Sequence, residues 1–153
     1  MKIKIIAVGK IKEKYFTVGI EEYLKRLKPL CDLSLMEVKE VNTNDISKNK
    51  AEEAKNILAK IDENDYLITL EVKGKMIDSI TLASFIKDHY TFSSKVLTFI
   101  IGGSDGLDDA VINKSQMHLS FSEFTFPHQL MRLILCEQIY RAMMIINNKP
   151  YHK

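Results

Sequence analysis

The sequence predicts an α/β fold in which helices cover both faces of a mostly parallel sheet. Segments with strand and helix patterning alternate along the chain, which is typical of parallel strands joined by crossover helices. Residues 95–101 form an almost wholly apolar run, as strands buried on both faces do. The 153 residues contain no linker-like tract, and 46% of them are hydrophobic, so we expect one domain over residues 1–153.

The N-terminal half is expected to form three strands separated by two helices. β-branched residues predict the strands, and apolar residues at helical spacing predict the helices. Gly9 and Pro29 mark two boundaries, and Asp45 or Ser47 can cap the second helix. The expected elements are a strand at 3–8, a helix at 15–27, a strand at 33–38, a helix that ends near Ile61 and a strand at 65–70.

The C-terminal half continues the alternation and ends in a long helix. Residues 73–75, Lys-Gly-Lys, predict a turn, and Asp78 or Ser79 can cap the helix that follows it. The remaining expected elements are a strand at 95–101, a short helix at 108–114, a short strand at 117–119 and a helix from about His128 to Asn147.

The last helix is apolar on every face, whereas a surface helix carries a single apolar stripe. One face can pack on the sheet and another on a second subunit, which predicts a homodimer formed through this helix. The alternative is a monomer in which the helix is buried at the centre, and few domains of this size enclose a helix completely.

Composition excludes several classes of protein. Lys and Arg number 22 and Asp and Glu 20, and a net charge of +2 does not by itself indicate a polyanionic partner. Cys31 and Cys136 lie in apolar contexts without CxxC spacing, which favours buried thiols in a reducing compartment. The apolar run at residues 3–8 is too short for a signal peptide or a membrane span, so we expect a cytoplasmic protein without a membrane partner.

Two segments near the end of the predicted sheet can bind a ligand. Gly102-Gly103-Ser104-Asp105-Gly106 follows a buried strand, which is where α/β proteins bind ligands, but a plain tight turn explains the glycines equally well. The segment Phe121–His128 places aromatic rings before the last helix, which suits a flat ligand or a half-buried strand. His128 is expected to hydrogen-bond at the helix start. His89 and His118 lack metal-ligand spacing, so we expect no metal site.

Two of the three arginines, Arg132 and Arg141, lie in the apolar last helix. A guanidinium group binds phosphate or carboxylate through two parallel hydrogen bonds, which a lysine cannot do. Glu137 lies one helical turn before Arg141, so an intrahelical ion pair is the alternative for that residue. Nine residues separate Arg132 from Arg141, so the two side chains point about 180° apart around the helix. Both could contact one ligand only if each came from a different protomer of a dimer.

The C-terminal residues 147–153 combine an aromatic ring, an imidazole and two ammonium groups. Tyr151 can stack on a base, Lys149 and Lys153 can contact phosphate, and His152 can accept a proton near neutral pH. The alternative is a solvated, frayed terminus.

Several motifs along the whole chain resemble the RlmH family of SPOUT-class methyltransferases. The most specific are the block from Thr125-Phe126-Pro127-His128 to Tyr140-Arg141-Ala142 and the terminal Tyr151-His152-Lys153. The other similar segments are residues 1–10, 70–75, 100–106 and 119–124. The resemblance implies transfer of a methyl group from S-adenosylmethionine to N3 of pseudouridine 1915 in 23S ribosomal RNA within the ribosome. It also implies a trefoil-knotted C-terminal region.

Carried over by position, the resemblance assigns a cofactor-binding set to this chain. The residues are Leu70, Gly102, Phe121, Ser122, Glu123, Phe124, Thr125 and Phe126.

The reaction that the resemblance implies suggests roles for the basic and aromatic residues. N3 of a uracil ring carries a proton, so attack requires deprotonation and donors that stabilise the charge moved onto oxygen. We expect His152 to take this proton and Tyr151 to position the base. Arg132, Arg141 and Lys153 would hold phosphate or the developing oxyanion. These five residues are the expected RNA contacts.

Two other functions are compatible with parts of the pattern. A Rossmann-like nucleotide-binding enzyme needs a glycine-rich loop after its first strand, and Val8-Gly9-Lys10 lacks the further glycines. A non-catalytic ribosome-binding module would keep the basic tail without a donor pocket. Residues 124–153 contain four Lys or Arg and one acidic residue, a local charge of +3 that a homodimer would double.

Overall fold

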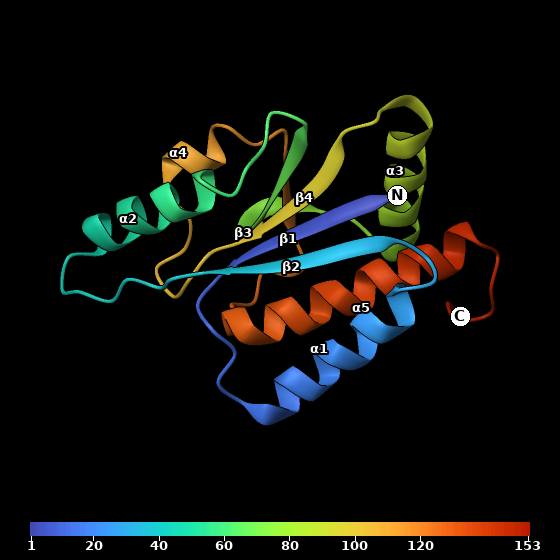
Figure 1. Ribbon diagram of the computed structural model, residues 1–153, viewed down its shortest axis with the longest axis horizontal. Helices are drawn as coiled ribbons and strands as arrows, with labels where there is room; N and C mark the ends of the chain where they lie inside the picture. The colour runs from blue at the N-terminus through green and yellow to red at the C-terminus, as the bar shows by residue number, and fades with distance from the viewer.

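A computed structural model describes residues 1–153. Strands and helices alternate along the chain, as predicted (Figure 1). The strands are β1 (Lys2–Val8), β2 (Asp32–Val38), β3 (Asp65–Met76), β4 (Val96–Ile101) and β5 (Met117–Ser120). The helices are α1 (Lys14–Leu27), α2 (Ile46–Leu58), α3 (Ser79–Phe92), α4 (Asp109–Ile112) and α5 (His128–Ile146).

The five strands form one sheet in the order β2-β1-β4-β3-β5, and every neighbouring pair is parallel. The predicted parallel sheet is therefore confirmed. Because all strands run the same way, the segments that follow them emerge at one edge of the sheet.

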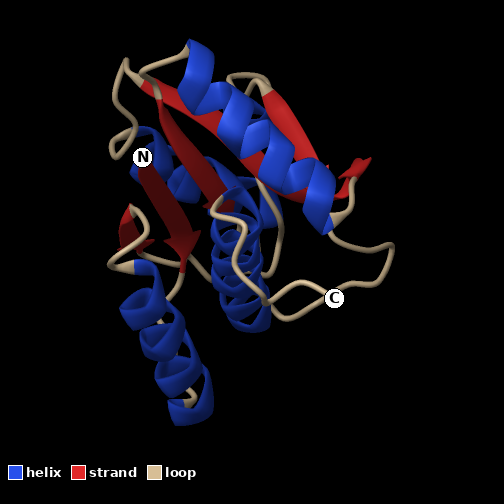
Figure 2. Ribbon diagram, turned by 90° about the vertical axis from the view of Figure 1, so that its right-hand side faces the viewer, coloured by secondary structure: helices blue, strands red, loops and turns tan.

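The two faces of the sheet carry separate hydrophobic clusters. Ile3, Ile5 and Ala7 of β1 pack with α1, α3 and α5, whereas Ile6 and Val8 pack with α2 and α4. This alternation follows from the two-residue period of a strand. Helices therefore cover both faces, as Figures 1 and 2 show.

Helix α5 lies on the sheet between α1 and α3 (Figure 1). Its fully buried residues recur at helical spacing and are Arg132, Leu135, Cys136, Ile139, Ala142 and Met143. Leu130, Ile134 and Met144 are only half-buried and lie outside that core. The rest of the chain therefore covers most of the apolar surface of α5, but not all of it.

The predicted turn at residues 73–75 is wrong, because β3 continues to Met76. The pairing of β3 with β5 shifts register after Leu70 and resumes at Lys75. A Cβ atom at Gly74 would collide with the backbone of Leu119, so glycine here permits a close approach between two strands. Glycine is typical both of a turn and of a close approach between strands, so the sequence did not distinguish the two.

The predicted helix boundaries are confirmed at their starts and differ at some ends. The side chains of Asp45 and Asp78 cap α2 and α3 by accepting hydrogen bonds from Lys48 N and Thr81 N. Helix α2 ends at Leu58, three residues before the predicted end, and α4 is shorter than residues 108–114.

Both cysteines are free and buried, as predicted. Burial raises the pKa of the Cys31 thiol to about 11 and that of the Cys136 thiol to about 12. None of the helices combines the length and the apolar character needed to cross a lipid bilayer.

Candidate functional site

A cavity of about 890 Å³ opens at the edge of the sheet where β3, β4 and β5 end. Its wall consists mainly of the end of β3, the glycine loop (residues 102–106) and residues 119–128. This volume falls in the range of small-molecule sites. Parallel strand direction is the reason that segments far apart in sequence meet here.

The residues assigned to a cofactor lie almost entirely in this wall. Those that line the cavity are Leu70, Gly102, Phe121, Ser122, Phe124, Thr125 and Phe126. Glu123 is exposed and is not part of the lining. The structure thus brings seven of the eight residues together around one space.

The glycine loop is a tight turn and is also part of the cavity wall. The two alternatives for this segment, a plain turn and a loop at a ligand site, are therefore compatible. The Gly106 N–H donates to the Gly103 carbonyl at 3.1 Å, and Gly106 has a φ of +81°. A Cβ atom at Gly102 would lie 2.9 Å from the Gly106 carbonyl carbon. The turn therefore closes tightly because residue 102 has no side chain.

The segment from Phe121 to Pro127 is irregular, so the half-buried strand was the wrong alternative. The Ser120 hydroxyl donates to the Ser122 carbonyl at 2.9 Å, and the Phe124 N–H donates to the Ser122 hydroxyl oxygen at 3.0 Å. These local hydrogen bonds replace strand pairing. They leave the Phe124 side chain 78% exposed at the cavity rim.

Helix α2 and the segment before it support the glycine loop from behind. The buried Asn49 amide donates to the Asp105 carboxylate at 3.1 Å, and the Ser104 hydroxyl donates to Glu40 at 3.4 Å. Gly103 packs between Val8 and the Glu53 carboxyl, where a Cβ atom would lie 3.0 Å from Val8 Cγ1. Residues distant in sequence therefore fix the shape of this loop.

Glu53 is a buried carboxyl beside the glycine loop. Its Oε1 accepts a hydrogen bond from Val41 N–H at 2.9 Å, whereas its Oε2 has no partner. Burial raises the pKa of this carboxyl, and the charges of Glu40 and Asp105 raise it further.

The lining contains four charged residues that sequence reasoning did not assign to a ligand, Lys50, Glu71, Lys73 and Asp109. Glu71 had a signal, because it directly follows the predicted third strand at the ligand-binding edge of the sheet. Its Oε1 lies 2.8 Å from His118 Nδ1, and Thr69 Oγ1 contacts both groups. No sequence signal marked Lys50, because only the packing of α2 brings it to the cavity.

The tail residues fold back onto α5 around Glu137. This carboxylate accepts hydrogen bonds from Arg141 at 2.6 and 3.0 Å and from the Tyr151 hydroxyl at 3.1 Å. The Arg141 guanidinium also lies 4.7 Å from the centre of the Tyr151 ring, and its Nη1 lies 3.4 Å from His152 Nδ1. Burial and neighbouring Tyr23 and Glu137 raise the pKa of Tyr151, so its phenol stays protonated.

The structure therefore unites Arg141, Tyr151 and His152 in one cluster, which we name the tail cluster, together with Glu137. The intrahelical pair between Glu137 and Arg141 is formed. Lys153 is exposed beyond it.

Arg132 lies elsewhere, and its position requires a correction. Its side chain has no exposed surface, so its guanidinium is not open to an RNA phosphate in this structure. Nη1 pairs with Glu37 at 2.7 Å, and Nη2 donates to the carbonyls of Gly9 at 3.0 Å and Val8 at 3.2 Å. The sequence could not show this, because the partners lie about a hundred residues away.

The cavity and the tail cluster lie at different places along α5. His128 at the start of the helix lines the cavity, whereas the tail follows Ile146. The tail cluster forms around Glu137 and Arg141, which lie about 14 and 20 Å along the helix from His128, and Figure 1 shows the C-terminus toward the far end. None of residues 147–153 lines the cavity of its own chain.

Comparison with known proteins identifies the family. A family model described as "Predicted SPOUT methyltransferase" matches residues 1–152. The chain belongs to the SPOUT methyltransferase family.

Similar sequences within this family carry a more specific name. "Ribosomal RNA large subunit methyltransferase H" of Finegoldia magna is 49% identical over 159 residues, covering 100% of both chains. The protein of the same name from Carboxydothermus hydrogenoformans is also 49% identical with the same coverage. The family resemblance found in the sequence is thereby confirmed.

Solved structures of other proteins share the fold of this SPOUT methyltransferase at low sequence identity. A probable methylase family protein from Haemophilus influenzae has a TM-score of 0.56 at 14% identity, covering 99% of this chain and 70% of the other. A probable methyltransferase from Bordetella pertussis has a TM-score of 0.54 at 12% identity, with coverage of 93% and 96%.

Substitution of Glu53 by Gln tests the buried carboxyl. A raised pKa in the folded state means that the carboxyl stabilises the fold at low pH, and that this contribution is lost as the pH rises above the ordinary value for Glu. The Gln variant keeps the acceptor for Val41 and has no charge to bury. We therefore expect its free energy of unfolding, relative to wild type, to increase between pH 4 and pH 7.

Denaturant unfolding at several pH values measures this difference, and one pKa unit corresponds to about 1.4 kcal/mol. Glu52→Gln on the same helix is the matched control, because Glu52 is half-exposed and pairs with Lys55. A difference between Glu53→Gln and wild type that stays constant with pH would contradict the assignment.

Proposed function

We propose that this chain transfers a methyl group from S-adenosylmethionine to N3 of pseudouridine 1915 in 23S ribosomal RNA of the large subunit. The observation that carries this proposal is the cavity at the sheet edge, which gathers seven of the eight residues that the family resemblance assigns to the cofactor. The names of relatives at 49% identity over the full chain support the RNA substrate.

The lining fits this cofactor. Gly102 leaves backbone open for close approach, and aromatic rings at residues 121, 124 and 126 suit an adenine ring. Glu71, Asp105 and Asp109 provide carboxylates for a cationic ligand. We propose that Leu70, Gly102 and residues 121–126 hold the cofactor, which supplies a methyl group on a positively charged sulfur. No metal is required.

The protein's part in the reaction is alignment and control of one proton. Holding donor and acceptor in line can contribute several kcal/mol. N3 of the acceptor ring must lose its proton before or during attack, and we propose that His152 takes it. Arg141 donates toward His152 Nδ1 in this structure, so a turn of Arg141 toward the RNA frees that nitrogen for the proton.

The other tail residues hold the RNA. Arg141 and Lys153 bind phosphate or the oxyanion that forms at the carbonyls flanking N3. Tyr151 stays protonated and presents its ring edge and hydroxyl to the base. Arg132, which is buried, acts on the RNA only through the loop whose carbonyls it binds.

The reaction also requires a homodimer. Because no tail residue lines the cavity of its own chain, we propose that the tail of one protomer completes the cavity of the other. Leu130, Ile134 and Met144 are half-buried and offer apolar side chains on one side of α5 for that contact. Glu137 and Arg141 lie on the same side, between Ile134 and Met144. A trefoil-knotted C-terminal region, a single domain over residues 1–153 and a cytoplasmic location complete the proposal.

Mass spectrometry of the target nucleotide tests the activity. Ribosomes from a strain without the modification, incubated with this protein and S-adenosylmethionine, should gain one methyl group at pseudouridine 1915. Calorimetry with S-adenosylmethionine alone should show one site per chain. Binding to ribosomes without cofactor binding or methylation would instead indicate a non-catalytic module.

Substitution of His152 by Ala tests the proton acceptor. A positioned general base contributes about 10²-fold or more, so the single-turnover rate should fall by that amount and lose its rise with pH below neutrality. Lys149→Gln in the same tail is the control and should leave the pH profile unchanged. An unaltered rate and profile in His152→Ala would eliminate this role.

A mixed dimer tests the arrangement of the site. Gly102→Val should block the cavity, and the double variant Tyr151→Ala/His152→Ala should remove the tail function, so each homodimer should be inactive. A heterodimer purified through two different tags keeps one intact cavity facing one intact tail, and should show about half the wild-type rate. If the tail served its own cavity, this heterodimer would be inactive.

A further inference from the structure

The loop between β1 and α1 and the first turn of α1 carry an exposed basic and aromatic cluster that the proposed reaction does not use. We name residues 10–15, Lys-Ile-Lys-Glu-Lys-Tyr, the basic loop. Lys10, Lys12 and Lys14 are all exposed, and the Tyr15 side chain is 67% exposed. Ile11 between them is half-buried and packs on the core of α1 and α5.

Contacts with α5 and β2 hold the basic loop in place. The Lys12 N–H donates to Gln129 Oε1 at 3.0 Å, and the Ile11 N–H donates to Glu37 Oε1 at 3.4 Å. The buried Arg132 binds the Gly9 carbonyl immediately before the loop. Burying a guanidinium is costly, and here Nη1 and Nη2 tie β1, β2 and α5 together at one point, whereas Nε has no partner.

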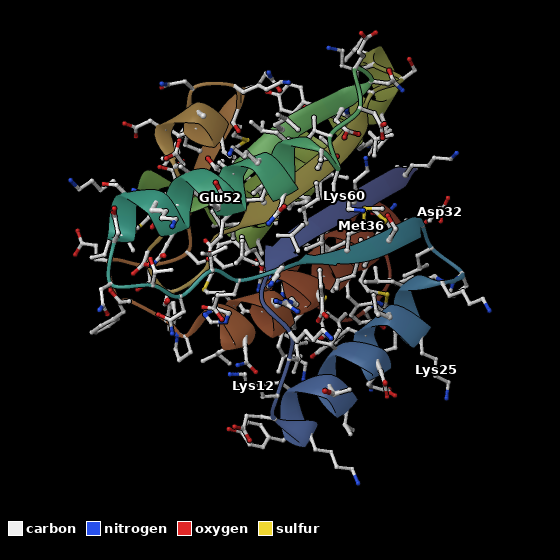
Figure 3. All side chains as sticks on the ribbon, turned by 60° about the vertical axis from the view of Figure 1, so that its left-hand side comes forward. Lys12, Lys25, Asp32, Met36, Glu52 and Lys60 are labelled. Carbon is white, nitrogen blue, oxygen red and sulfur yellow. The ribbon has the colours of Figure 1, made fainter.

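The basic loop lies beside the cavity. A Cβ atom at Gly9 would be 3.3 Å from His128 Nε2, and His128 lines the cavity wall. Figure 3 marks Lys12 on this loop, on the side of the molecule where α5 begins. The backbone of Lys12 is therefore held beside the first turn of α5, which borders the cavity.

The charges of the basic loop are not neutralised within the chain. None of its three lysines forms an ion pair or a side-chain hydrogen bond. Glu37, which accepts the Ile11 N–H, is paired with Arg132. Glu13 offsets one charge, so the loop keeps +2, as much as the whole chain.

We propose that the basic loop is a second RNA-binding element, in which Lys10, Lys12 and Lys14 contact the phosphate backbone and Tyr15 stacks on an unpaired base. Lysines on a rigid segment neutralise phosphates and release counterions, and an exposed tyrosine provides a stacking surface that accepts any base. The loop then binds RNA at the rim of its own protomer's cavity, opposite the tail that the partner contributes. This inference rests on the proposed RNA substrate.

The triple variant Lys10→Gln/Lys12→Gln/Lys14→Gln tests the phosphate contacts. Binding of unmodified large ribosomal subunits is measured by filter binding between 50 and 200 mM salt, together with the KM and kcat of methylation. We expect Kd and KM to rise about 10-fold or more, with kcat unchanged. The slope of log Kd against log salt should fall by about 2, since each single-strand phosphate contributes about 0.7.

The triple variant Lys28→Gln/Lys60→Gln/Lys95→Gln is the matched control. It removes the same charge from exposed lysines at the opposite edge of the sheet, where Figure 3 labels Lys60. It should leave Kd and the salt slope close to wild type. Equal losses of RNA affinity in the two triple variants would mean that only net charge matters, and would overturn the proposal. An unchanged Kd in the variant of Lys10, Lys12 and Lys14 would also overturn it.

Tyr15→Ser separates stacking from charge. It should weaken RNA binding about 5-fold or more while the salt slope stays at the wild-type value, because stacking releases no counterions. Unchanged binding overturns the role of Tyr15. Calorimetry with S-adenosylmethionine should give the wild-type Kd for all variants, which shows that the cavity is intact.

Failure of the proposed function gives a different result. Wild-type protein that binds large subunits but does not methylate them contradicts the activity, while the binding measurements still decide the role of the basic loop. Wild-type protein that binds no ribosomal RNA contradicts both.

Discussion

The common direction of the five strands is the constraint on which the candidate site depends. Because every strand pair is parallel, the ends of β1, β3, β4 and β5 emerge at one edge, and the segments that follow them meet there. This alignment gathers the end of β3, the glycine loop and the aromatic segment around one cavity. It also brings Gly9, at the end of β1, against His128. Reversal of any one strand would move its ligand-binding residues to the opposite edge.

Helix α5 links the two chemical regions of the molecule and separates them at the same time. Its first turn borders the cavity, its second turn supplies Arg132, which holds the carbonyls of Val8 and Gly9, and its middle carries the Glu137 and Arg141 pair that organises the tail. The sheet, α1 and α3 cover most of its surface, so the helix is a rigid spacer of about 28 Å. Within one chain, the cavity and the tail that folds back onto Glu137 are separate regions.

Local signals in the sequence were sufficient where one segment settles the question alone. Asp45 and Asp78 cap helices through contacts three residues away, and the apolar residues 96–101 form a strand wherever it is placed in the sheet. The same kind of reasoning failed at Gly74, since glycine marks a turn and a close strand approach equally well. It failed again at Arg132, whose type suggested an exposed phosphate ligand. The burial of Arg132 depends on carbonyls more than a hundred residues away, which no local pattern records.

The amino-acid sequence was enough to establish the α/β class, the parallel sheet, most element boundaries and the family, because periodicity, capping and specific motifs are properties of neighbouring residues. Seven of the eight assigned cofactor residues also proved to share one cavity, since their motifs follow strands that end at the same edge. Only the tertiary structure decided which charged side chains are buried inside the fold and which are exposed without a partner. Arg132 and Glu53 are buried, whereas Lys10, Lys12 and Lys14 are exposed without partners, and these differences arise from packing between elements that are remote in the chain.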